Sequence, residues 1–332
     1  MVDVPLSVLE LATVAEGSSA AGALAEATAL AGHLERLGYH RIWVAEHHGM
    51  PAVASSAPAV LVAHLAAATS SIRVGSGGVM LPNHAPLVIA EQFGTLEALH
   101  PGRIDLGLGR APGTDHHTAR ALRRAADLGA EHFPEDVVEL VGYFTGAVER
   151  PRAMPGLGYL PEVWLLGSSL FSAQLAGLLG LPFSFAHHFS PRFTEPALER
   201  YRESFRPSAV LGSPRAMVAV AVVCAPSEEE ARWVAGPALL SALQLRTNRF
   251  GPLPSPEAAA AYRYTPEERA VVEEVAATYV VGDPAAVRAG LDDLAARTGA
   301  DELMVTTRVH GYADRLRSFE LVAGAWGLKP PG

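Results

Sequence analysis

Three titratable side chains stand together where an apolar run of the sequence ends. Glu46, His47 and His48 directly follow residues 42–45, whose composition is typical of a short buried strand. Carboxylate and imidazole groups bind metal ions, exchange protons near neutral pH and form hydrogen bonds in protein cores. The triplet therefore leaves three hypotheses open: a metal site, an acid–base site and a structural network.

Metal binding is the weakest of these hypotheses. Adjacent histidine pairs occur at 47–48, 116–117 and 187–188. Neighbouring side chains of a strand point to opposite faces, so each pair supplies one inward ligand at most. The first apolar run, 4–11, also lacks the His-x-His pair that barrel metallohydrolases commonly carry there. We therefore expect no bound metal.

Glycines replace side chains near the ends of two further apolar runs. In "GSGG" (75–78), Gly77 and Gly78 either let a flat ligand lie against the backbone or mark a β-bulge. The stretch "GLGRAPG" (107–113) has the spacing GxGxxxG in a fourth βα unit, which differs from a dinucleotide-binding fingerprint. Arg110 within this stretch suits a phosphate or a flavin carbonyl, and the alternative is a surface ion pair.

A serine-rich turn follows a fifth apolar run. In "LLGSSLFSAQ" (165–174), Gly167, Ser168 and Ser169 lead into a helical pattern, and Ser172 lies about one turn further on. The free N–H groups of a helix N-terminus, together with hydroxyl groups, bind anions and most simply a phosphate. An ordinary serine N-cap is the alternative.

Short apolar runs that alternate with helical patterns must position these residues. We expect strands at 4–11, 41–46, 72–80, 103–110, 162–168, 183–189, 216–225 and 302–307. This order predicts an α/β fold, a parallel (β/α)8 TIM barrel, with a doubly wound open sheet as the alternative. Active sites of such barrels lie at the carboxyl ends of the strands, where the residues above fall.

The predicted barrel accounts for the whole chain, 1–332, as a single domain. Two stretches, 111–161 and 244–282, are longer than an ordinary connection between a strand and a helix. They follow the predicted strands 4 and 7, so we expect insertions that cover the pocket at the carboxyl ends.

The composition limits the function classes. Hydrophobic residues make up 49% of the 332 residues, which provides a large core. The formal net charge of -9 argues against a nucleic-acid partner. No signal peptide or long apolar segment is visible, and the single cysteine, Cys224, suits a reducing compartment. We expect a cytoplasmic protein without nucleic-acid or membrane partners.

Taken together, the motifs resemble those of the bacterial luciferase-like flavin monooxygenases, and most closely the single-chain group from bacterial secondary metabolism. The matching stretches are "WVAEHHG", "RVGSGGVMLPNHAPLVIAEQFGTLEALHPGRIDLGLGRAPGTD", "LLGSS" with "AGLLGLPFSFAHHF", and "VVGDPAAV". They occur in order over nearly the whole chain. Where light-emitting members carry tryptophans after the sixth strand, this chain has "FAHHF", so light emission and substrate preference are not carried over.

The resemblance implies a barrel that binds reduced FMN at the carboxyl ends of its strands. It places Glu46 and His47 beside the flavin as catalytic residues and leaves His48 a structural role. The implied cofactor-binding residues are Glu46, Gly77, Gly78, Arg110, Gly167, Ser168, Ser169 and Ser172. The resemblance also implies a homodimer formed through helices at about 57–69 and 86–99.

The same resemblance implies the reaction. Reduced FMN reacts with O2 to give a C4a-hydroperoxide, which transfers one oxygen atom to a small organic substrate such as a polyketide. No NAD(P)H-binding motif is visible, so we expect a separate NAD(P)H flavin reductase to supply the reduced FMN. Three alternatives stay open: a deazaflavin-dependent hydride-transfer enzyme, a metal-dependent barrel hydrolase and a non-catalytic flavin-binding protein.

Overall fold

The fold is a closed ring of parallel strands surrounded by helices. The computed structural model describes residues 3–110, 118, 121–122 and 130–330. The strands of the ring are β1 (Leu6–Glu10), β2 (Arg41–Val44), β3 (Arg73–Met80), β4 (Ile104–Gly109), β5 (Glu162–Gly167), β6 (Phe183–Ala186), β7 (Ala216–Cys224) and β9 (Glu302–Thr306). The described helices are α1 (Ala20–Leu37), α2 (Pro58–Ala67), α3 (Pro86–Leu99), α5 (Phe133–Thr145), α6 (Leu170–Leu179), α7 (Thr194–Ser204), α8 (Glu228–Arg246), α9 (Pro256–Ala261), α10 (Pro266–Ala276), α11 (Pro284–Thr298) and α12 (Tyr312–Trp326).

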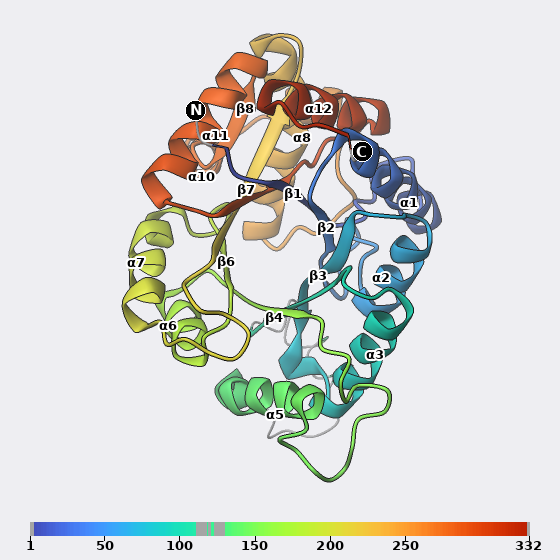
Figure 1. Cartoon of the computed structure of the whole chain (residues 1–332). Coiled ribbons are helices and arrows are strands. Elements are labelled where there is room, and N and C mark those ends of the chain that lie inside the picture. The colour runs from blue at the N-terminus through green and yellow to red at the C-terminus, as the bar shows by residue number, and fades with distance from the viewer. Residues whose placement is uncertain (1–2, 111–117, 119–120, 123–129, 331–332) are drawn as a thin grey trace.

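The strand pairing closes the ring. Neighbouring strands follow the order β6-β5-β4-β3-β2-β1-β9-β7, and a parallel pairing of β6 with β7 joins the two ends. Figure 1 shows the helices arranged around this ring. The predicted (β/α)8 TIM barrel and its eight strands are confirmed, with slightly shorter strand ends, and the open-sheet alternative is wrong.

Local sequence signals begin and end the helices around the ring. The Ser19 side chain caps α1, and Gly38, with φ at 85°, ends this helix in the left-handed conformation. Ser227 caps α8 ahead of three glutamates in the first turn, where negative charge favours the helix dipole. Asp283 and Pro284 begin α11 in a similar way. These signals set the residues at which the helices begin and, at Gly38, the residue at which α1 ends before the next strand.

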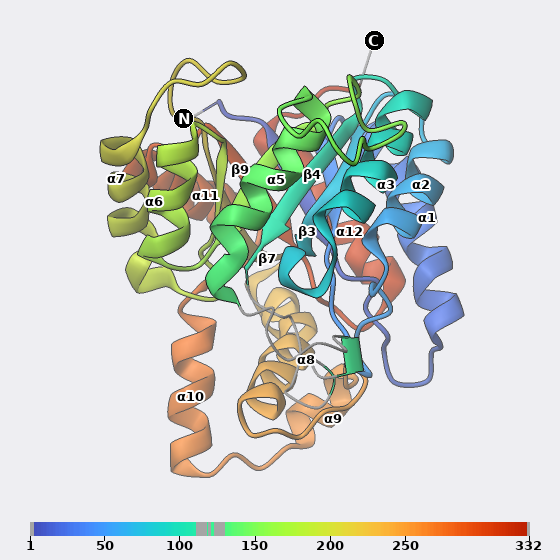
Figure 2. The same ribbon diagram turned by 90° about the horizontal axis from the view of Figure 1, so that it is seen from below.

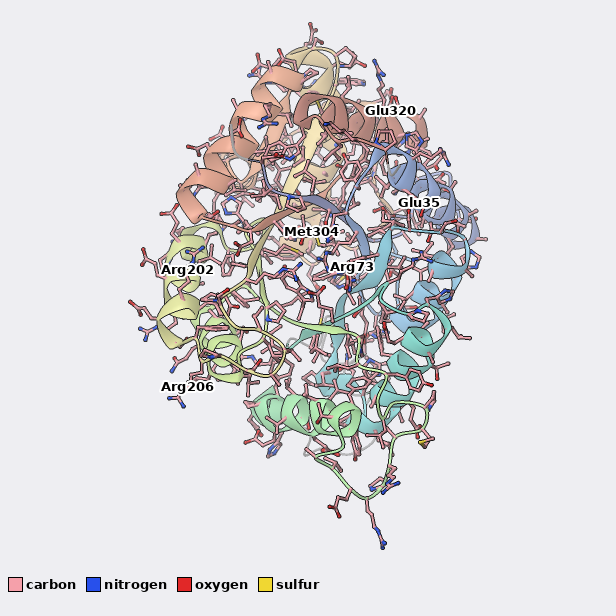
Figure 3. All side chains as sticks on the ribbon, in the orientation of Figure 1. Glu35, Arg73, Arg202, Arg206, Met304 and Glu320 are labelled. Carbon is pink, nitrogen blue, oxygen red and sulfur yellow. The ribbon has the colours of Figure 1, made fainter. Side chains whose placement is uncertain are left out.

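Large side chains fill the middle of the barrel. Trp43 and Trp164 meet edge to face, with ring centroids 5.5 Å apart, and pack with Met217 and Met304. In Figure 3, Met304 lies at the centre of the ring, whereas the labelled Glu35 lies on the surrounding helix α1. This apolar layer forms the floor for anything that binds at the carboxyl ends of the strands.

A buried ion network occupies the amino-terminal end of the barrel. Arg41 donates hydrogen bonds to Asp105 at 2.8 Å, Glu162 at 3.0 Å and Glu302 at 2.8 Å. Burial alone would lower the pKa of Arg41, but the three carboxylates outweigh burial and raise it. Because these charges satisfy one another, we assign this end of the barrel to stability.

The connection after β7 covers the carboxyl ends of the strands. In Figure 2, α8, α9 and α10 lie together beyond one end of the barrel. This confirms the insertion predicted after the seventh strand. The insertion predicted after the fourth strand lies partly outside the described residues, and its described part contains α5, which packs against α3.

A ninth strand, β8 (Tyr279–Gly282), is missing from the sequence prediction. It pairs with the last four residues of β7. On the same edge of β7, the first four residues pair with β6. The four residues of β8 lie inside the predicted insertion and are too few to give a recognisable periodicity. Its position brings Tyr279 to the mouth of the barrel, where it lines a cavity.

Candidate functional site

A cavity of about 520 Å³ opens at the carboxyl ends of the barrel strands. Its floor is largely apolar and includes Leu9, Trp43 and Met304. The predicted site residues that line it are His47, Gly77, Gly78, Arg110, Gly167, Ser168, Ser169 and Ser172. These residues are far apart in the sequence and meet because the ends of all strands in a parallel barrel converge on one face.

A second cavity, of about 540 Å³, lies at the amino-terminal end of the barrel. Arg41, Arg73 and Arg215 line it, and each of these arginines pairs with a carboxylate of the buried network. None of the predicted site residues lies there. The chemistry therefore belongs to the cavity at the carboxyl ends.

Glu46 is not among the residues that line this cavity. Its fully buried carboxylate accepts hydrogen bonds from His48 Nε2 at 2.9 Å, from His84 Nε2 at 2.8 Å and from the backbone N–H of Met80 at 3.0 Å. Burial raises the pKa of Glu46, but the hydrogen bonds outweigh burial and lower it. Contrary to the expectation that Glu46 faces the flavin, its carboxylate ties the end of β2 to the segment that follows β3.

His47 is the member of the triplet that lines the cavity. Its backbone N–H donates to the carbonyl oxygen of Ser55 at 3.0 Å, which holds the chain at this point. His48 does not line the cavity, and its Nε2 lies 2.9 Å from the carboxylate of Glu46. The structural hypothesis thus describes Glu46 and His48, which contact each other. His47 lines the cavity, and its acid–base role stays a prediction.

Gly77 and Gly78 form a bare stretch of cavity wall on β3. A Cβ atom on Gly77 would lie 2.7 Å from Leu9 Cδ1, and one on Gly78 would lie 2.7 Å from the carbonyl oxygen of Gly107. The Gly77–Gly78 peptide bond is cis, and the register with β4 shifts between Gly77 and Val79. The β-bulge is therefore confirmed, and the same glycines leave backbone open toward the cavity.

The turn from β5 into α6 brings Ser168, Ser169 and Ser172 to the cavity. Ser169 occupies the N-cap position of α6, yet its side chain makes no capping hydrogen bond. A Cβ atom on Gly167 would lie 2.4 Å from the Cβ atom of Ser172, so a glycine is needed for the turn to pack against the helix. The first-turn N–H groups and these hydroxyls form a donor set of the kind that binds phosphate.

Arg110 follows β4, the neighbour of β5 in the ring. Its guanidinium carbon lies 4.5 Å from the centre of the Phe171 ring in the first turn of α6. In the part of the chain that the structure describes, no carboxylate pairs with this arginine. The positive charge therefore lies beside the serine turn, and the described residues provide no surface ion pair of the kind that the alternative reading expects.

Six polar residues that the sequence reasoning missed also line the cavity: Ser184, His188, Arg246, Tyr279, Thr306 and Arg308. His188 Nδ1 lies 3.0 Å from the carbonyl oxygen of Ala219 and must donate to it, which leaves Nε2 as an acceptor in the neutral ring. Burial lowers the pKa of His188 and favours this neutral form. The available signal was the position of His188 near the carboxyl end of the predicted strand 183–189 and of Arg308 just beyond the predicted strand 302–307, whereas Tyr279 lies on the strand that was not predicted.

The charged groups of the cavity wall are all basic. Arg110, Arg246 and Arg308 line it, and among the described residues no aspartate or glutamate does so. Arg246 pairs with Glu274 at 3.2 Å. Arg110 and Arg308 have no such partner within the described ranges. The wall thus favours ligands that carry negative charge.

Neither a metal-binding cluster nor a membrane-spanning helix is found among the described residues. No group of three or more histidine, cysteine, aspartate or glutamate side chains in them is arranged to hold a metal ion. The histidine pair 116–117 lies outside the described residues. No described helix is both long enough and apolar enough to cross a membrane.

Comparison with known proteins relates the chain to one family. The model of a family described as luciferase-like monooxygenase matches residues 4–302. A luciferase-like monooxygenase of Escherichia coli (strain K12) is 48% identical over 320 residues, which cover 96% of each chain. The crystal structure of apo-MsnO8 is 39% identical and has a TM-score of 0.92, with 99% of this chain and 100% of that chain covered.

A more distant structure shows the fold alone. It is the oxygenating constituent of 3,6-diketocamphane monooxygenase from Pseudomonas putida, a type II Baeyer–Villiger monooxygenase in complex with FMN. It is 18% identical and has a TM-score of 0.72, and the alignment covers 99% of each chain. The family match and the high identity to the bacterial relative extend over the barrel and its cavity. The chain therefore belongs to the luciferase-like monooxygenase family and is an oxygen-incorporating oxidoreductase.

Proposed function

We propose that this protein is a monooxygenase that takes reduced FMN as a cosubstrate. One observation carries the proposal: a bare glycine wall, a serine turn at a helix N-terminus and an arginine with no carboxylate partner among the described residues line a single cavity. When bound, reduced FMN supplies the electrons that activate O2 so that one oxygen atom enters an organic substrate. From the resemblance in the sequence, the proposed substrate is a secondary metabolite such as a polyketide.

The serine turn and Arg110 would hold the FMN phosphate. The hydroxyls of Ser168, Ser169 and Ser172 and the first N–H groups of α6 are donors, and the guanidinium of Arg110 adds positive charge. Because β4 and β5 are neighbours, the charge and the donors lie on the same side of the cavity. The contact with Phe171 keeps the guanidinium in place.

The glycine wall would hold the flat ring system. Gly77 and Gly78 present backbone to the cavity, and the clashes that a Cβ atom would make leave no room for larger residues. A planar ligand can therefore lie directly on this part of β3. His47, at the end of the neighbouring β2, lines the same cavity.

His47 is the proposed group that holds and moves a proton during oxygen transfer. His188, in its neutral form, offers Nε2 as a second acceptor in the same cavity. Glu46 is a positioning residue in this proposal, since its hydrogen bonds fix the chain on either side of His47 and at Met80. The apolar floor and the covering helices after β7 keep water out of the cavity.

The proposal is tested by mixing anaerobically reduced FMN with the protein and then with O2. We expect oxidised flavin to return more slowly than in a solution of free FMN, because the cavity shields the bound flavin from water. Reoxidation at the rate of free FMN would count against the proposal. A parallel titration with a deazaflavin distinguishes the monooxygenase from the alternative enzyme class. Tight binding of the deazaflavin in place of FMN would favour the hydride-transfer enzyme.

The proposed partners are a separate NAD(P)H flavin reductase and a second copy of the chain, with the cytoplasm as the proposed location. The dimer would form through α2 and α3, where Val60 is 71% exposed and Val88 is 46% exposed. Replacing both valines by aspartate should convert a dimer into monomers in sedimentation experiments, because charge opposes an apolar interface. A wild-type protein that sediments as a monomer would contradict this part of the proposal.

A further inference from the structure

Arg308 lies in the cavity with most of its hydrogen-bonding capacity unused. A guanidinium has five N–H donors. Here Nη2 donates to the hydroxyl of Ser241 at 3.1 Å, and the buried Nε has no partner among the described residues. No carboxylate in the described ranges pairs with it. Arg41, at the other end of the barrel, is by contrast surrounded by three carboxylates.

An unpaired guanidinium in such a place is costly to the folded protein. Burial lowers the pKa of Arg308, while nearby Tyr279 acts weakly in the opposite direction. This free-energy cost is removed when an anion binds in the cavity, because a guanidinium and a carboxylate form two parallel charge-assisted hydrogen bonds. The cavity supplies the space, and none of the described residues that line it is an aspartate or glutamate that would compete for the arginine.

The position of Arg308 separates it from the phosphate site. Arg308 follows β9, whereas Arg110 follows β4, and the order β4-β3-β2-β1-β9 places these strands on opposite sides of an eight-stranded ring. A phosphate held at the serine turn is therefore across the mouth of the barrel. Ser241 and Tyr279, both from the long connection after β7, and His188, which follows β6, are polar neighbours of Arg308.

We propose that Arg308 binds a carboxylate of the organic substrate and thereby selects acidic substrates. This inference rests on the proposed function, because it assigns the space between the flavin and the β9 wall to the substrate. The acid end of the substrate contacts Arg308, and the atom to be oxidised is directed toward the glycine wall and His47. The long connection after β7 shapes the pocket around the acid.

The test compares acids with their neutral amides on FMN-loaded protein. Octanoate and octanamide form one pair, phenylacetate and phenylacetamide the other, and calorimetry measures each affinity. In the wild type we expect the acid of at least one pair to bind about ten- to one hundred-fold more tightly than its amide. Arg308→Gln should abolish this preference, and Arg308→Lys should restore part of it because the charge returns. Arg246→Gln, the matched control, removes a cavity arginine that is already paired with Glu274 and should keep the preference.

The outcomes separate this inference from the proposed function. Equal or absent binding of acids and amides by the wild type, or a preference that survives in Arg308→Gln, overturns the role of Arg308. A loss of FMN affinity in Arg308→Gln with the acid preference intact also overturns this role, because the arginine would then bind the flavin and not the substrate. Failure of the wild type to bind FMN counts instead against the proposed function, and the acid–amide comparison is then run without FMN, with the same criteria.

Discussion

At the residue scale, the direction of a side chain decides its role more than its type does. Glu46, His47 and His48 are consecutive, yet only His47 lines the cavity. The carboxylate of Glu46 accepts hydrogen bonds from His48, His84 and a backbone N–H, and Glu46 does not line the cavity. His188 adds an imidazole from another strand end, with its tautomer set by a carbonyl oxygen.

The first prediction concerns the proton carried by His47. His47→Ala should reduce oxygen transfer by about 100-fold or more, because a positioned acid–base group contributes at least this much. Stopped-flow mixing of the reduced FMN complex with O2 would show faster flavin reoxidation and more released peroxide. His40→Ala, immediately before the other end of β2, is the control and should behave as the wild type. An unchanged trace in His47→Ala would remove this residue from the reaction.

The second prediction concerns the phosphate contact of Arg110. Arg110→Met should weaken FMN binding by about ten- to one hundred-fold, as expected for the loss of a charged hydrogen bond. Riboflavin, which lacks the phosphate, should bind the variant and the wild type equally. Fluorescence titration measures both affinities. An equal loss for both ligands would place Arg110 at the ring system and not at the phosphate.

At the scale of elements, the site depends on three adjacent strand ends. The bulge in β3 supplies the glycine wall, β4 supplies Arg110, and the turn after β5 supplies the serines. The pairing of β3 with β4 and of β4 with β5 holds these groups in one arrangement. The covering helices come from a different part of the chain, after β7, so the proposed cofactor side and the proposed substrate side of the cavity have separate structural origins.

The third prediction tests the contact between β3 and β4. In Gly78→Ala the new Cβ atom would lie 2.7 Å from the Gly107 carbonyl oxygen, which is backbone and cannot turn aside. We expect a loss of about 1–3 kcal/mol in the free energy of unfolding, together with weaker FMN binding. Chemical denaturation and FMN titration measure the two effects.

A matched glycine controls this experiment. Gly324 lies in α12, and a Cβ atom there would meet nothing within 4 Å. Gly324→Ala should leave FMN affinity unchanged and should not destabilise the protein, since alanine favours a helix over glycine. If Gly78→Ala behaves like Gly324→Ala, then the wall is not as tightly packed as its geometry indicates.

At the scale of the whole molecule, the two ends of the barrel have opposite uses. The amino-terminal end pairs its arginines with carboxylates, whereas at the carboxyl end no carboxylate of the described ranges pairs with Arg110 or Arg308. The tryptophan and methionine layer lies between the two ends. Stability and ligand binding are therefore assigned to different sets of charges.

The fourth prediction concerns acid stability. Burial raises the pKa of Glu162, but Arg41 and Arg215 outweigh burial and lower it from 4.5 to about 2. Because the folded-state pKa lies below the unfolded value, the contribution of Glu162 to stability is complete above pH 4.5. It is lost as the pH falls toward 2. Unfolding curves followed by tryptophan fluorescence should show this decline.

Glu162→Gln provides the comparison. The variant should be less stable at neutral pH, and its stability should change less with pH over this acid range, because an amide does not titrate. An equally steep decline in the variant would assign the acid sensitivity to other carboxylates of the network.

Much of this protein follows from local sequence. Eight near-continuous apolar runs between helical patterns were sufficient to predict the barrel, and the carboxyl ends of those runs contained eight of the residues that line the cavity. Both signals are local, because an apolar run and a helix boundary can each be recognised from a few consecutive residues. The four-residue strand β8 escaped prediction, since its identity comes from pairing with the long β7 and not from its own pattern.

Only the tertiary structure decided which polar groups are already satisfied. The sequence places Glu46 beside His47, but the hydrogen bonds from His48 and His84 turn its carboxylate away from the cavity. In the same way the sequence places Arg41 at the start of one predicted strand and Arg308 after the end of another, but it does not show which of the two has carboxylate partners. The difference is the presence or absence of carboxylates from distant strands, and such long-range pairing is set by the closure of the barrel and not by any local pattern.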